Sequence, residues 1–198
     1  MRIQTADGDP VLLRPLAVSD EPALREAIES FSNRTRYMRF FSGVAAVPDP
    51  VIHMLADVDG TCHMAWVAID ETVPGGKVIG AAHIIRDNPS LSAGELAIGL
   101  VDDWQSRGVA RLLIALVSAE ALAKGVAAMD AYVLHENRAG RALMRALGAQ
   151  SAGSDGAVSH YRVHLAQMLE QFEARDSDIP LQAVMPAIHS GSVQAAAA

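Results

Sequence analysis

The 198-residue chain has a single cysteine, Cys62, so it cannot form an internal disulfide bond. That count is typical of proteins from a reducing compartment. The N-terminus lacks the apolar run of a signal peptide. No stretch of about 18 consecutive apolar residues is present to span a membrane. We therefore expect a cytoplasmic protein with no membrane partner.

Positive charge is scarce over most of the sequence. The 16 Lys and Arg residues face 23 Asp and Glu, which gives a net charge of −7. Such a chain is a poor general partner for nucleic acid, and we expect none. Residues 105–145 reverse the balance, because basic side chains outnumber acidic ones there. Charge alone leaves open whether this segment is a solvated helix face or a site for an anionic ligand.

Patterns typical of metal ligands are missing as well. His160 and His164 share one face of a predicted strand without a matching cysteine or acidic pair, so we expect no metal cofactor. Cys62 stands beside His63 with no further relay in the sequence, which favours a buried thiol over a nucleophile.

The apolar residues alternate with a strand period first and with a helical period later. Three consecutive strands with short connections, at 62–70, 77–86 and 94–102, indicate an antiparallel meander. The other predicted elements are a strand at 11–16, helices from 19, at 33–41 and at 50–57, a helix from 109, a strand at 127–135, a helix at 137–147 and a strand at 158–165. We expect an α/β fold, with a mixed, mostly antiparallel central sheet of about six to seven strands flanked by helices.

Residues 1–165 form the predicted domain. The periodicity weakens after residue 166, and Pro180, Pro186 and Ser190 to Ser192 follow. We therefore expect 166–198 to form a short helix and a flexible C-terminal tail. A docked arm that covers a neighbouring subunit is the alternative, and the chain can be a monomer or a homodimer.

The loop between the strand at 94–102 and the next helix has the most informative composition. N–H groups in the first turn of a helix have no internal partner and lie at the positive end of its dipole, so they bind anions such as pyrophosphate. Gly108 and Ala110 keep the approach open, while Arg107 and Arg111 add charge nearby. The loop matches neither the P-loop nor the Gly-x-Gly-x-x-Gly spacing.

The strand before this loop places a carboxylate beside very small residues. A period of two puts Glu95, Ala97, Gly99 and Val101 on one face. That face is either a solvated edge or a groove in which a ligand arm lies along the small residues and ends at Glu95.

Two motifs make a resemblance specific. The sequence Gln105-x-x-Gly108-x-Ala110 resembles the acetyl-CoA signature of the GNAT N-acetyltransferase superfamily. The segment 137–148, in which an Asn opens a helix that ends in Leu-Gly, is similar to that family's second cofactor-side element. Residues 32–41 with their Arg-Phe-Phe, together with Glu95 and Asp103-Trp104-Gln105, look most like the bacterial protein-lysine acetyltransferase branch.

The resemblance implies that acetyl-CoA is the cosubstrate and an amine is the acceptor, with a protein lysine as the candidate. It implies that Glu95 is the general base and that the pyrophosphate lies on the N–H groups of the loop. The pantetheine would run where the strand splays from its neighbour near Leu134. The implied cofactor-binding residues are Leu100, Val101, Gln105, Ser106, Arg107, Gly108, Val109, Ala110, Arg111 and Asn137.

One position departs from the family. Met144 stands where many members carry a Tyr that protonates the departing thiolate, so the sequence assigns no proton donor. Two alternatives therefore stay open: a non-catalytic acyl-CoA-binding sensor, and an acetyltransferase for a small-molecule amine. For catalysis we expect Glu95 to be partly buried against apolar walls, because burial makes a carboxylate a stronger base.

Overall fold

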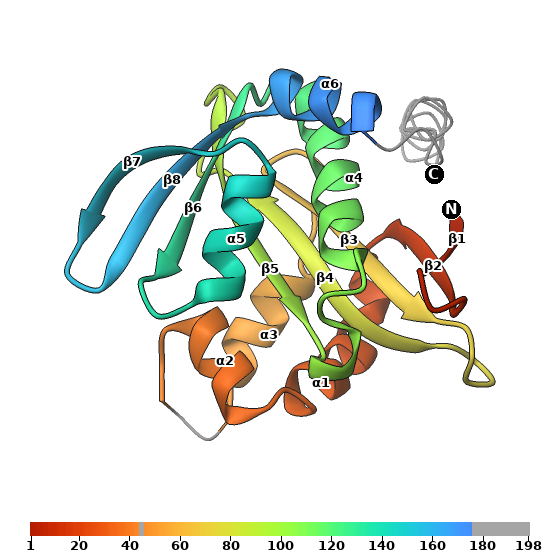
Figure 1. Cartoon of the computed structure of the whole chain (residues 1–198). Helices are drawn as coiled ribbons and strands as arrows, with labels where there is room; N and C mark the ends of the chain where they lie inside the picture. The colour runs from red at the N-terminus through yellow and green to blue at the C-terminus, as the bar shows by residue number, and fades with distance from the viewer. Residues whose placement is uncertain (44–45, 176–198) are drawn as a thin grey trace.

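The computed structural model describes residues 1–43 and 46–175 of the chain (Figure 1). Eight strands form one mixed sheet in the order β1-β2-β3-β4-β5-β6-β8-β7. The strands are β1 (Arg2–Gln4), β2 (Pro10–Pro15), β3 (His63–Asp70), β4 (Lys77–Ile85), β5 (Ala93–Leu100), β6 (Ala128–Leu134), β7 (Gln150–Asp155) and β8 (Val158–His164). The expected α/β fold and the antiparallel β3-β4-β5 meander are confirmed.

β1 and β7, the two outermost strands, were not predicted from the sequence. β1 has three residues, too few to show a period. All six residues of β7 are exposed, so this strand has no buried face to impose alternation on its sequence.

Helices cover both faces of the sheet (Figure 1). They are α1 (Glu21–Glu29), α2 (Asn33–Phe40), α3 (Asp49–Ala56), α4 (Val109–Ala123), α5 (Arg138–Ala146) and α6 (Leu165–Arg175), with short 3-10 turns at Val18–Asp20 and Asp102–Trp104. α1 and α3 pack on one face, where Ile28 and Leu55 share a core with Val67 of β3. α4, α5 and α6 contribute to a larger core that includes β6 and β8.

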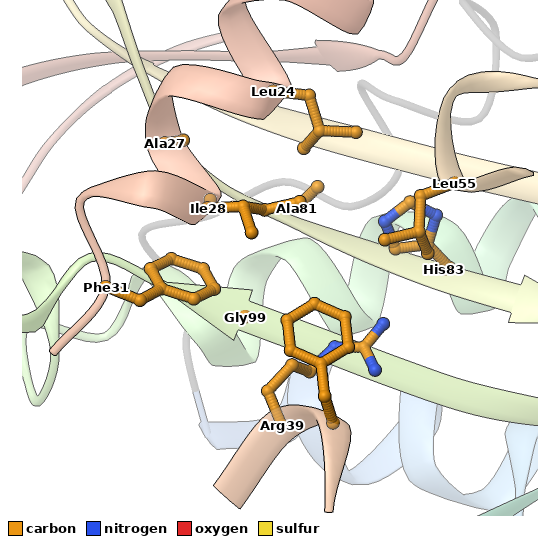
Figure 2. Close-up of a pocket in the computed structure, with 11 residues that line it drawn as sticks. Leu24, Ala27, Ile28, Phe31, Arg39, Leu55, Ala81, His83 and Gly99 are labelled. Atoms are coloured by element: carbon orange, nitrogen blue, oxygen red, sulfur yellow. The ribbon is translucent and has the colours of Figure 1, made fainter. Parts of the chain in front are cut away.

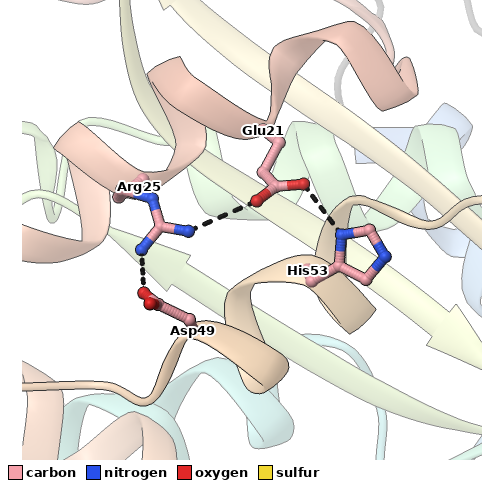
Figure 3. A network of polar contacts seen from close by, with 4 residues as sticks. All are labelled: Glu21, Arg25, Asp49 and His53. Carbon is pink, nitrogen blue, oxygen red and sulfur yellow. Dashed lines mark hydrogen bonds and ion pairs between the residues drawn. The ribbon is translucent and has the colours of Figure 1, made fainter.

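Polar contacts join α1 to α3 at the surface (Figure 3). Arg25 pairs with Asp49 and, at 3.3 Å, with Glu21. Glu21 also contacts Nδ1 of His53 at 3.0 Å, and the hydrogen bond to this carboxylate raises the pKa of His53. Exposed pairs of this kind add little stability, so apolar burial is what holds the two helices to the sheet.

β5 and β6 are parallel and pair at one end. Within the described residues the register contains three pairs, and the last is Glu95 opposite Asp130. Beyond that pair the two strands diverge, and α5 lies beside the opening (Figure 1). This divergence supplies the gap that the resemblance predicts.

α6 belongs to the core of the domain. Met168 and Phe172 are buried among core residues, and α6 contacts α4. The short helix predicted after residue 166 therefore packs like the other helices. The predicted tail at 176–198 lies outside the described residues. In the part of the chain that is described, no helix is both long and apolar enough to cross a membrane.

Candidate active site

A cleft of about 680 Å³ lies between α2, the end of β5, the loop before α4 and the start of α5. Seven of the ten residues that the sequence assigned to a cofactor line it, namely Leu100, Gln105, Ser106, Gly108, Ala110, Arg111 and Asn137. The structure therefore brings together, in one cavity, residues from two motifs about thirty positions apart in the chain.

The side chains of the other three residues lie elsewhere. Val109 is fully buried in the core, and Val101 packs against apolar residues of both cores. The Arg107 guanidinium lies 2.7 Å from Oδ2 of Asp9 and 3.7 Å from Oδ2 of Asp7. Two aspartates of the β1–β2 turn therefore compensate the positive charge that Arg107 was expected to add near the loop.

The loop turns sharply before α4 begins. Ser106 has a φ of 63° and Gly108 a φ of 85°, both in the left-handed region. Gly108 is the N-cap residue and has no side chain to cap the helix. The first-turn N–H groups of α4 are therefore left without a side-chain cap, as an anion-binding helix terminus requires.

Hydrogen bonds tie this loop to α2. The side-chain amide of Gln105 donates to the carbonyl of Leu100 at 3.2 Å and to Oγ1 of Thr35 at 3.1 Å. Asp102 accepts from the N–H and hydroxyl of Ser32, at 2.9 and 2.7 Å, and from the hydroxyl of Thr35 at 2.8 Å. Gln105 of the signature therefore holds the wall of the cleft in place.

These contacts make α2 one side of the cleft. The sequence did not indicate that this helix has a part in cofactor binding. Arg34, Thr35, Met38 and Arg39 all line it. The run of arginines at 33–41 was the signal in the sequence, but helix packing decides which of them face the cavity.

Asp102 is held as a carboxylate. Burial would raise its pKa, but the hydrogen bonds from Ser32 and Thr35 outweigh burial and hold the pKa of Asp102 below its usual value. A carboxylate that already accepts three hydrogen bonds is poorly suited to take a proton from an amine.

Glu95 lies in a smaller cavity of about 110 Å³ at the point where β5 and β6 diverge. This cavity shares Arg39, Ile98 and Asn137 with the larger cleft, so Glu95 lies next to the cleft rather than in it. The residue is exposed, so the expected partial burial is wrong. It lies at the last paired position of β5 and β6, at the closed end of the gap between them.

Gly99 is small for a packing reason. A Cβ built there would lie 3.0 Å from Cζ of Phe31 and 3.8 Å from Cδ of Arg39. The small face of β5 therefore receives side chains from α2 and the turn before it. The groove that the alternation suggested is partly filled by them.

Asn137 caps α5. Its Oδ1 accepts a hydrogen bond from the N–H of Gly140 at 2.8 Å, and the residue lines both cavities. Met144 is 2% exposed and lines the cavity of Glu95. A thioether has no proton to give, so the missing acid of the sequence analysis is not replaced at this position.

The fold and the site define an α/β protein with a cleft between α2, the end of β5 and α5, and with the helix N-terminus of α4, which lacks a side-chain cap, at its wall. Residues 28–149 match the model of the acetyltransferase (GNAT) family. Because this match covers more than half of the sequence, the chain belongs to the GNAT acetyltransferase family.

Two relatives are acetyltransferases by name. Acetyltransferase Pat of Mycolicibacterium smegmatis is 33% identical over 148 residues, which are 74% of this chain and 43% of that protein. The chain thus spans less than half the length of Pat. Acetyltransferase PA5475 of Pseudomonas aeruginosa is 31% identical over 144 residues, which are 72% of this chain and 76% of that protein.

Solved structures show the same fold. The GNAT domain of S. lividans PAT superposes with a TM-score of 0.76 at 23% identity, covering 83% of this chain and 96% of that one. The PaiA N-acetyltransferase of Thermoplasma acidophilum, solved in complex with coenzyme A, has a TM-score of 0.61 at 14% identity, with 78% and 98% covered.

The network around Asp102 predicts a pH-dependent stability. Because the folded-state pKa of Asp102 is lowered, its contribution is complete above the ordinary Asp pKa of about 4 and is lost as the pH falls through the folded-state value. Asp102→Asn should cost about 1 kcal/mol at pH 7, since the carboxylate is partly screened by solvent, and less at pH 3. Urea unfolding at the two pH values measures this. Asp103→Asn, next to it and also exposed, is the control, and an equal cost of Asp102→Asn at both pH values would contradict the assignment.

Proposed function

We propose that this protein transfers the acetyl group of acetyl-CoA to an amine. The observation that carries the proposal is the position of the signature loop, 105–110, at the N-terminus of α4 and on the wall of the 680 Å³ cleft. Membership of the GNAT family supports it, as does the coenzyme A complex of a protein with the same fold.

The cleft offers partners for each part of the cofactor. The N–H groups of residues 107–111 lie at the helix N-terminus, where a pyrophosphate would complete their hydrogen bonds. Arg111 and Arg138, both in the lining, would add positive charge. The pantetheine would lie along β5 after Glu95, where β6 has moved away and leaves one edge of the strand open to a ligand.

Glu95 is our proposed general base. An amine near neutral pH is mostly ammonium and has no lone pair for attack. Glu95 would accept one proton of the ammonium, directly or through a water molecule, and the neutral nitrogen would then form a bond to the thioester carbon. The C–S bond then breaks, and the departing thiolate takes, through water, the second proton that the nitrogen loses. Backbone N–H groups of β5 would stabilise the oxyanion. The two bound substrates would displace water from the exposed carboxylate and make it a stronger base.

We propose a protein lysine as the acceptor. The similarity of residues 32–41 and Glu95 to the protein-lysine acetyltransferase branch supports this choice. The net charge of −7 would also attract a cationic amine. The second candidate is a non-catalytic acyl-CoA sensor, which the buried Met144 in the cavity of Glu95 favours.

Substitution of Gly108 tests the cofactor site. A tryptophan at this position should fill the approach to the helix N-terminus, so Gly108→Trp should weaken acetyl-CoA binding at least about 100-fold in calorimetry. Gly125→Trp is the matched control, because Gly125 lies at the other end of α4, has the same φ of 85° and, like Gly108, has no described atom within 4 Å of an added Cβ. Equal affinities of the two folded variants would refute the placement.

The acceptor is tested in a cell lysate. Incubation with enzyme and acetyl-CoA should produce acetyl-lysines, detected by mass spectrometry, above those formed with acetyl-CoA alone. The lysine proposal fails if small amines are acetylated in a thiol-release assay while proteins are not. Tight acetyl-CoA binding without turnover of any acceptor would favour the sensor.

Replacement of Glu95 tests the mechanism. Glu95→Gln preserves size but removes the base, so kcat should fall by about 10²–10⁴ while acetyl-CoA affinity changes little. The acidic limb of the pH–rate profile should disappear. Glu170→Gln, at an exposed position of α6, should behave as the unmodified protein. Wild-type turnover of Glu95→Gln between about pH 6 and 9 would show that Glu95 is an ordinary solvated residue.

A further inference from the structure

Arg39 of α2 lies where three cavities meet. It lines the large cleft, the cavity of Glu95, and a third cavity of about 20 Å³ beneath α1. Figure 2 shows its side chain rising from α2 toward Gly99 and His83. The guanidinium carbon lies 4.8 Å from the centre of the Phe40 ring. Among residues 1–43 and 46–175, no group forms a hydrogen bond or an ion pair with the guanidinium of Arg39.

Arg39 is half-buried, and its guanidinium has donors to offer to a ligand. The guanidinium has five N–H donors, and the contact with an aromatic ring satisfies none of them as a hydrogen bond would. Burial lowers the pKa of Arg39 to about 10, and the charge of Glu95 partly opposes that shift. Arg39 is therefore a cation at neutral pH, with its donors available at the junction of the cavities.

His83 is not a counter-ion for Arg39. Nδ1 of His63 lies 3.1 Å from the carbonyl of Asp57, so this nitrogen must carry a hydrogen. In neutral His63 the other nitrogen, Nε2, is then an acceptor, and it lies 3.0 Å from Nδ1 of His83. Nδ1 of His83 therefore donates, and its Nε2 holds a lone pair.

His83 is also neutral. It is 2% exposed, and burial, the charge of Arg39 and the neighbouring His63 all lower its pKa. The cavity that His83 shares with Arg39 has room for about one water molecule, which could accept from the guanidinium and donate to the histidine. That water would orient Arg39 without neutralising its charge.

Two anions near Arg39, the pyrophosphate of the cofactor and Glu95, already have other roles under the proposed function. Under the proposed function, the pyrophosphate lies at the N-terminus of α4 with Arg111. Glu95 shares a cavity with Arg39 but does not pair with it, and a base held in an ion pair would lose basicity. The remaining place for an anion is on a substrate, close to the thioester.

We propose that Arg39 binds a free carboxylate carried by one of the two substrates. The first source is the acyl group, which would make the enzyme a transferase for dicarboxylic acyl-CoA thioesters such as succinyl-CoA. The second is an acidic side chain next to the acceptor lysine. This inference rests on the proposed function and specifies its substrate. The chemistry is unchanged: the C–N bond forms, the C–S bond breaks, one nitrogen proton goes to Glu95 and the second to the thiolate, and the carboxylate keeps its charge at Arg39.

The geometry favours the acyl group as the source. Arg39 and Glu95 line the same cavity of about 110 Å³, and the acyl carbon must lie near Glu95 to be attacked. A carboxylate two or three bonds beyond that carbon would stay within this cavity or reach the one beneath α1.

The test compares paired substrates. One arm measures kcat/KM for succinyl-CoA and for acetyl-CoA with a lysine peptide that has no acidic side chain. The other uses acetyl-CoA with peptides that carry Glu or Gln next to the lysine. Wild-type enzyme should prefer the carboxylate in one arm, and Arg39→Gln should reduce that preference about 10–100-fold, the usual worth of a hydrogen-bonded charged contact. Arg39→Lys should retain part of it, and Arg145→Gln, at an exposed site on α5, should retain all of it.

Two outcomes would overturn the inference. In the first, the wild type shows no preference for the carboxylate in either arm. In the second, Arg39→Gln lowers the turnover of substrates with and without the carboxylate by the same factor. Turnover of acetyl-CoA would then still support the proposed function. If no acceptor is turned over, calorimetry tests both sources of the carboxylate. The acyl carboxylate is excluded if Arg39→Gln does not change the ratio of the affinities for succinyl-CoA and acetyl-CoA. The acidic side chain next to the lysine is excluded if the Glu and Gln peptides bind with equal affinity.

Discussion

The site depends on the early separation of β5 from β6. Parallel neighbours in a sheet normally exchange hydrogen bonds along their length, but these two stop after the pair of Glu95 and Asp130. The backbone groups beyond that pair must find other partners, since unpaired N–H and C=O groups are costly when buried. An extended ligand with amide groups, such as pantetheine, supplies such partners. The same separation leaves Glu95 at the closed end of the gap, beside the place where a thioester would lie.

The second constraint is the attachment of α2. Asp102 and Gln105 lie just after β5, and both bond to residues at the start of α2. One short loop therefore fixes the strand end, the helix N-terminus of α4 and the opposite wall of the cleft. Because Arg39 is carried by α2, the position of this cation relative to Glu95 depends on the same few hydrogen bonds.

Local patterns in the sequence were sufficient to predict the meander, the helices and the loop that contains Gly108. Each of these signals lies within a short stretch of chain, either as a period or as a motif. The exposed β7 gave no period to read, and the role of Gly99 depends on Phe31, far away in sequence. The compensation of Arg107 by Asp9 is equally non-local, since 98 positions separate the two residues. What the sequence could not supply was which distant side chains meet.

The presence of Glu95 and Arg39 in one cavity also bears on substrate selection. A fixed cation near the thioester repels the ammonium of an incoming lysine, and repulsion between desolvated like charges costs several kcal/mol. A carboxylate bound to Arg39 would cancel that field and let the ammonium approach Glu95. Specificity would then come from both effects, because the cation attracts the charged substrate and penalises an uncharged one. A guanidinium that no described residue pairs with at this junction therefore favours a charged substrate over one with a neutral acyl group.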